Sequence, residues 1–170
     1  TEYEYRIVSK HITRCDPYHV RFGKEVESPW YDFRTFDPKA REVTFVVAND
    51  IHDNAEKCRK MLDVQPMDEA EIVFYNGDIM SHFSKEGQPF KSFIDVSVEK
   101  FAKNKPFAVV RGNHETRGHL ARSYDEFIHN TRDGKYYGVY YFGDTVVVML
   151  DGGEDKDDEH PVYAGLVDFD

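Results

Sequence analysis

The pattern of apolar and polar positions divides the chain into a β-rich beginning and a mixed remainder. Near the start, three stretches alternate apolar and polar side chains as half-buried strands do, at residues 1–10, 19–22 and 30–36. Asp37-Pro38 then interrupts the alternation. We therefore predict a β-rich segment over residues 1–38, which either ends a separate β unit or adds edge strands to the main fold.

From residue 39 onward, nearly continuous apolar runs are separated by segments of helical periodicity. The runs are typical of strands covered on both faces, at residues 43–48, 71–75 and 107–110. Apolar side chains spaced three or four residues apart predict helices, at residues 54–64, 90–102 and 120–130. Two further runs predict a hairpin, at residues 136–142 and 145–150. This order of elements predicts an α/β domain in which mixed sheets form a layered sandwich.

Each of the three apolar runs ends in polar residues that bind metals in other proteins. The first run is followed by Asp50 and His52, the second by Asp78, and the third by Asn113 and His114. In an α/β fold, ligands bind just beyond the carboxyl ends of the strands. We therefore expect these five side chains to gather at one edge of the sheet.

The chemistry of this set favours a divalent cation. Carboxylate and amide oxygens and imidazole nitrogens are hard or borderline ligands. Strand alternation would direct Asp50 and His52 to the same side, and a carboxylate such as Asp78 can bridge two cations. The alternative is that Asp50 and Asp78 only shape the turns that follow the strands, a common role of aspartate.

Three motifs in order resemble the calcineurin-like metallophosphoesterases: Asp50-x-His52, then Gly77-Asp78, then Gly112-Asn113-His114-Glu115. The resemblance implies a four-layer α/β/β/α sandwich and the hydrolysis of phosphate mono- or diesters. It also implies two divalent ions (Mn, Zn or Fe) that together hold a hydroxide for in-line attack on phosphorus. Asp50 and His52 would bind the first ion, Asp78 would bridge, and Asn113 would bind the second.

The same resemblance implies roles for charged residues around the reacting phosphate. His114 would act as a catalytic general acid or stabilise the transition state. Arg111 is the second catalytic candidate, because it or Arg117 would add positive charge near the phosphate oxygens. In some members of the family a fibronectin type III-like domain precedes the catalytic domain, and residues 1–38 are similar to its last strands.

The sequence departs from the family pattern in three ways. The later histidine motifs that complete both metal shells do not follow Asn113, so residues 39–170 are expected to be the N-terminal half of the catalytic domain. A second chain would then supply the rest of the domain. One alternative is an incomplete fragment or subunit that binds a metal or phosphate without catalysis. Another is a β-rich binding module. The aspartate that pairs with the motif histidine in protein phosphatases is absent after Asp78, as is the tyrosine ligand of purple acid phosphatases.

The composition of the chain limits the classes of molecule that it is expected to bind. The net charge of −10 argues against general nucleic-acid binding, whereas bound cations would reverse the local charge for a phosphate-ester substrate. No apolar run approaches the length of a membrane span, and no apolar segment at the start is typical of a signal peptide. Family analogy alone leans towards a periplasmic or extracellular location. Cys15 and Cys58 are expected to be free thiols. The acidic run at residues 151–159 is expected to be a solvated loop, in which Asp151 is a weaker candidate for the site.

Overall fold

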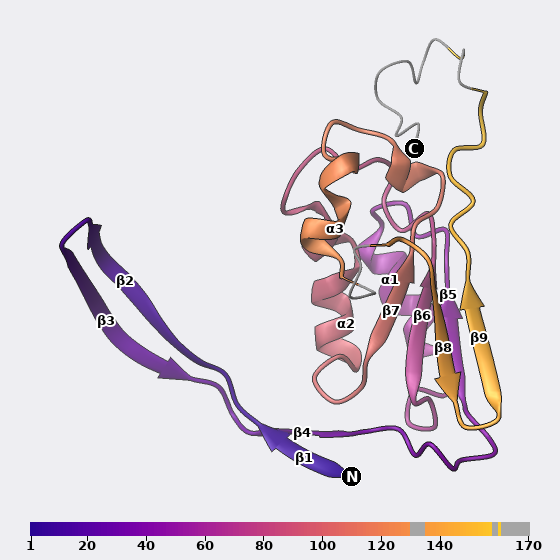
Figure 1. The fold of residues 1–170 in the computed structure, drawn as a ribbon, viewed down its shortest axis with the longest axis horizontal. Helices are drawn as coiled ribbons and strands as arrows, with labels where there is room; N and C mark the ends of the chain where they lie inside the picture. The colour runs from indigo at the N-terminus through magenta and orange to yellow at the C-terminus, as the bar shows by residue number, and fades with distance from the viewer. Residues whose placement is uncertain (130–134, 158–159, 161–170) are drawn as a thin grey trace. The chain divides into compact units, whose positions relative to one another are not determined.

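The computed structural model describes residues 1–129, 135–157 and 160, and it divides the chain into two units, Thr1–Thr35 and Phe36–Asp170. In the first unit, β1 (Glu2–Tyr5) pairs with β4 (Tyr31–Arg34), and β2 (Val8–Asp16) pairs with β3 (His19–Glu27). Both pairs are antiparallel (Figure 1). All the elements of this unit are therefore strands.

The N-terminal unit is a pair of ribbons in which most side chains are exposed. The rings of Tyr3 and Phe33 stack across β1 and β4 with their centroids 5.3 Å apart. One predicted boundary is wrong, because β3 continues through Gly23 and the sequence was expected to turn there. A Cβ atom at Gly23 would lie 3.2 Å from a methyl carbon of Thr13, so glycine allows the two strands to stay paired.

The centre of the second unit is a parallel sheet of three strands in the order β5 (Phe45–Ala48), β6 (Ile72–Asn76) and β7 (Phe107–Val110). The register places Val46 opposite Val73 and Phe74 opposite Ala108. The three apolar runs thus form the predicted strands, and β6 is buried on both faces.

Helices cover one face of this sheet (Figure 1). They are α1 (Ala55–Asp63), the π-helix η1 (Phe90–Ile94) and its continuation α2 (Asp95–Lys100). Asn54 caps α1, because its side-chain oxygen accepts a hydrogen bond of 2.9 Å from the backbone N–H of Lys57. Val73, Tyr75 and Val109 form the core with side chains from these helices.

An antiparallel hairpin covers the other face. Its strands are β8 (Gly138–Phe142) and β9 (Thr145–Met149), and Phe142 and Met149 pack with Phe74 and Ala108. The turn needs Gly143, whose φ is 57° and whose Cβ, if present, would lie 1.8 Å from the carbonyl oxygen of Ala40. The described residues therefore build helix, sheet and hairpin layers, and the fourth layer of the predicted sandwich stays a prediction.

Short helical turns follow β7. They are η2 (His114–Thr116), η3 (Ala121–Ser123) and α3 (Tyr124–Phe127). A short helix thus lies within residues 120–130 as predicted, and residue 130 lies outside the described residues. The helix predicted over 90–102 is present, but its first part, η1, is a π-helix instead of an α-helix. Among the described residues, no helix is long and apolar enough to cross a membrane.

Candidate metal centre

The loops after β5 and β6 hold a strained backbone at the carboxyl edge of the sheet. Four non-glycine residues adopt positive φ there: Asp50 (55°), His52 (52°), Asp53 (60°) and Asp78 (53°). Such conformations cost free energy and persist only where surrounding contacts enforce them. The enforcing contacts include backbone bonds between the two loops, from the N–H of His52 to the carbonyl of Asp78 (3.0 Å) and from the N–H of Asp53 to the carbonyl of Ile79 (2.9 Å).

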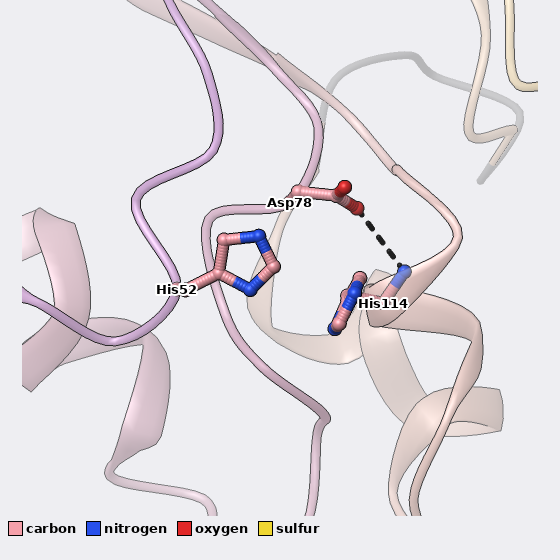
Figure 2. A group of neighbouring side chains, drawn as sticks. All are labelled: His52, Asp78 and His114. Atoms are coloured by element: carbon pink, nitrogen blue, oxygen red, sulfur yellow. Dashed lines mark hydrogen bonds between the residues drawn. The ribbon is translucent and has the colours of Figure 1, made fainter.

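His52, Asp78 and His114 meet where the three loops converge. Each offers one ligand atom, and these atoms lie within 4.8 Å of one another (Figure 2). The two imidazoles contact edge to face with centroids 4.4 Å apart. All three residues are half-buried, which leaves the group accessible to an ion from solvent. Two imidazoles and a carboxylate are a donor set that fits Mn²⁺, Fe²⁺ or Zn²⁺.

Asp50 and Asn113 lie at the margin of this group. An Asp50 side-chain oxygen lies 3.6 Å from Nε2 of His52, so these two predicted ligands are close, although Asp50 is the more exposed. Asn113 immediately precedes η2, and its side chain forms a hydrogen bond with Asp155. Because a carboxylate accepts that bond, the amide nitrogen of Asn113 is the donor and the amide oxygen remains for a cation.

The imidazole of His114 is held at both nitrogens. Nδ1 lies 2.8 Å from the carbonyl oxygen of Ser81, and Nε2 lies 3.3 Å from a guanidinium nitrogen of Arg117. A carbonyl oxygen only accepts and a guanidinium only donates, so the proton of neutral His114 is assigned to Nδ1. The carbonyl of Ser81 thus holds Nδ1 in a chain whose sequence lacks a paired aspartate after Asp78.

Arg111 does not join the three clustered side chains. Its Nε donates a 2.8 Å bond to Asp151, and both side chains are buried, with 9% and 7% exposure. The guanidinium carbon lies 3.9 Å from the ring centroid of Tyr136. Its Nη1 is buried and has no hydrogen-bond partner within the described part of the chain. These contacts indicate that Arg111 holds the loop after β9 in place.

Arg117 holds the same loop and also touches the site. It forms a two-pronged ion pair with Glu154, at 2.8 Å and 2.6 Å, and a further bond of 2.7 Å with Asp155. The Glu154 side chain is only 7% exposed. The prediction of a solvated loop over 151–159 is therefore wrong for Asp151 and Glu154, because the two arginines that follow β7 bury them; residues 158 and 159 lie outside the described part.

Two further carboxylates line the loops without joining the ligand cluster. Glu115 is fully buried, and burial raises the pKa of its carboxyl group against the opposing effect of hydrogen bonds from backbone N–H groups. Burial alone would raise the pKa of Asp53, but hydrogen bonds from Ser92, Ser81 and Gln88 lower it overall. Sequence reasoning assigned neither residue a role. The position of Glu115 beside His114 in the motif was the signal available.

Comparison with known proteins agrees with this geometry. The model of the calcineurin-like phosphoesterase family matches residues 43–168, which is most of the chain. The chain belongs to the calcineurin-like phosphoesterase family. The resemblance inferred from the three motifs is therefore confirmed.

One similar solved structure is a purple acid phosphatase isolated from seeds of yellow lupin (Lupinus luteus). The two chains are 15% identical with a TM-score of 0.57, a likeness that shows the fold alone. The match covers 88% of this chain and 30% of the lupin chain, so the present chain spans less than a third of its neighbour. A search of curated protein sequences gave no significant match.

Proposed function

We propose that this chain forms one side of a dinuclear metal centre that hydrolyses phosphate mono- or diesters. The observation that carries the proposal is the convergence of His52, Asp78 and His114 from three separate strand ends, within 4.8 Å of one another. Chance turn-forming residues would have no reason to point donor atoms at a common position. Membership of the family supports the reaction class.

The proposed ligands are those that the motifs indicate. Asp50 and His52 would hold the first ion, Asp78 would bridge, and the amide oxygen of Asn113 would bind the second. When bound, the two ions would activate water and neutralise the charge that develops on the phosphate oxygens. The identity of the ions as Mn, Zn or Fe is part of the proposal, as is the second ion itself.

His114 is the proposed proton donor to the leaving-group oxygen. The Ser81 carbonyl fixes the ring by accepting a hydrogen bond from Nδ1–H. The neutral ring carries its only proton there, so the proton given to the leaving group would come from Nε2 of the doubly protonated ring. Nε2 also lies next to Arg117, which is paired with Glu154. A catalytic contribution from Arg111 stays a prediction, and its pairing with Asp151 argues for an indirect one.

A second candidate is a fragment or subunit that binds a metal or phosphate without turnover. The small ligand set favours it, because five donor residues are few for two ions and the three clustered ones match a single ion best. The predicted second chain, and a separate role of residues 1–38 as a β-rich binding module, likewise stay proposals.

The test measures bound metal and hydrolysis of an aryl phosphate ester after reconstitution with Mn²⁺. It uses the 170-residue chain and any longer natural chain that contains it. Asp78→Asn should lose both metal and turnover, whereas Asp68→Asn, an exposed carboxylate, should lose neither. Metal binding without turnover in every chain would favour the binding function. If no chain binds metal, the dinuclear centre and the metal-binding alternative both fail, and Asp50, Asp78 and Asn113 revert to turn formers.

A further inference from the structure

Glu115 is a fully buried carboxylate whose hydrogen bonds reach two different loops. One oxygen accepts from the backbone N–H of Asp78 (2.9 Å) and of Gly112 (2.8 Å), and the other accepts from the N–H of Met80 (2.7 Å). Burying a carboxylate is costly unless its oxygens are hydrogen-bonded. Three backbone donors meet that need, and they come from the loop after β6 and the loop after β7.

These two loops touch at the point that Glu115 spans. A Cβ atom on Gly112 would lie 2.3 Å from a side-chain oxygen of Asp78, and one on Gly77 would lie 2.7 Å from the Cα of Gly112. The contact therefore requires both glycines and leaves no room for a side chain. The buried carboxylate of Glu115 joins the N–H groups on either side of the contact.

The loop after β6 is held at further points, and all of them bear on the orientation of Asp78. The backbone N–H of His114 donates to a side-chain oxygen of Asp78 (3.2 Å), as Figure 2 shows. The N–H of Ser81 donates to Asp53 (2.8 Å). Glu115 is the group that binds the N–H of Asp78 itself, the residue proposed to bridge the two ions.

We propose that Glu115 is a positioning residue of the metal centre: it joins the Asp78–Met80 segment to Gly112, so that the carboxylate of Asp78 faces His52 and His114. The inference rests on the proposed function for its effect on metal, but the loop contact itself is independent of any ion. Glu115 is not among the three residues whose ligand atoms cluster. Residues that orient a ligand in this way typically change metal affinity when they are altered.

The first test uses Glu115→Gln, which keeps the shape of the side chain. A glutamine nitrogen cannot accept a hydrogen bond, so at least one of the three N–H groups loses its acceptor. In the metal-free protein, amide exchange measured by NMR should become faster at Asp78, Met80 or Gly112. Phe101→Leu is the control, because Phe101 lies in the core behind the sheet, where its loss lowers stability without touching the loops.

The second test measures Mn²⁺ affinity by titration calorimetry and the Mn²⁺ EPR spectrum. Glu115→Gln should weaken Mn²⁺ binding roughly 10–100-fold, whereas Phe101→Leu should leave it unchanged. In the natural chain that shows turnover, kcat should fall more than KM rises. If Glu115→Gln does not fold, Glu115→Asp serves instead; it keeps the charge but shortens the reach, and a smaller loss of affinity is expected.

The outcomes separate the two proposals. Unchanged Mn²⁺ affinity in folded Glu115→Gln, or a loss matched by Phe101→Leu, would overturn the positioning role. If the unaltered protein binds no Mn²⁺, the proposed function fails, and amide exchange alone decides whether Glu115 joins the loops. Unchanged exchange at all three amides would overturn that role as well.

Discussion

Nδ1 of His114 lies 2.8 Å from the carbonyl oxygen of Ser81, and this contact decides which ring nitrogen carries the proton. Neutral histidine in water has no such constraint, whereas here the carbonyl accepts only from a protonated Nδ1. We expect ¹⁵N-edited NMR of the metal-free protein to show the Nδ1–H tautomer for His114. The exposed His119 is the internal reference and should show the ordinary mixture of tautomers. An Nε2–H tautomer for His114 would contradict the Ser81 contact.

Replacing His114 tests whether its side chain acts as a proton donor or as a metal ligand. If His114 donates a proton to the leaving group, His114→Asn should lower kcat by about 10²–10⁴-fold while Mn²⁺ content stays near that of the unaltered protein. Asparagine keeps a polar group at the site but cannot donate a proton at neutral pH. His119→Asn is the matched control. Loss of metal together with turnover would instead show that His114 is a ligand, as its place beside His52 and Asp78 permits.

Positions of strands and helices were predictable because local patterns determine them. The apolar residues of β5, β6 and β7 sit on a sheet that is covered on both faces, so their runs were continuous and easily recognised. Asn54 was predictable as a cap because its side chain acts three residues away. The three metal motifs were recognisable for a related reason, since each follows directly from a strand end.

Contacts between distant loops were not predictable. The bond from His114 to Ser81 uses a main-chain carbonyl 33 residues away, so no side chain marks it in the sequence. Arg117 and Glu154 lie 37 residues apart in the sequence. Glu154 belongs to an acidic run, and such runs are typical of solvated surface loops. Only the fold brings such groups together, which is why the contacts of Arg111 and Arg117 with the acidic loop could not be predicted from the sequence.

The ion pair of Arg117 and Glu154 should contribute to stability because both side chains are largely buried, with 13% and 7% exposure. Glu154→Gln leaves the guanidinium with Asp155 as its remaining carboxylate. We expect the free energy of unfolding to fall by about 2–3 kcal/mol in urea titrations. Glu99→Gln is the matched control, because Glu99 also forms a two-pronged pair, with Arg59, but at the surface, where the loss should be much smaller. Equal losses would show that burial does not strengthen the Glu154 pair.

The two cysteines should differ sharply in reactivity. Cys15 is exposed on β2, whereas Cys58 is fully buried in α1, where burial raises the pKa of its thiol. The thiolate is the reactive form, so a higher pKa and the lack of access act in the same direction. A thiol reagent at pH 8 should titrate one cysteine in the native protein and two in urea. Cys15→Ser should remove the fast reaction; rapid labelling of that variant would place Cys58 at the surface.

Metal should stabilise the fold if the ligands are assembled only in the native state. A ligand that binds the native protein alone adds about 2.7 kcal/mol at a free concentration of 100 times Kd, and the effect grows with concentration. Mn²⁺ should therefore raise the melting temperature measured by circular dichroism, and a chelator should reverse the shift. Asp78→Asn should melt at one temperature with and without Mn²⁺, because its amide lacks the negative charge and the second ligand oxygen that the carboxylate of Asp78 brings to the cluster with His52 and His114. A shift that survives in Asp78→Asn would place the stabilising ion elsewhere, for instance at the exposed acidic side chains, and would separate metal binding from the proposed centre.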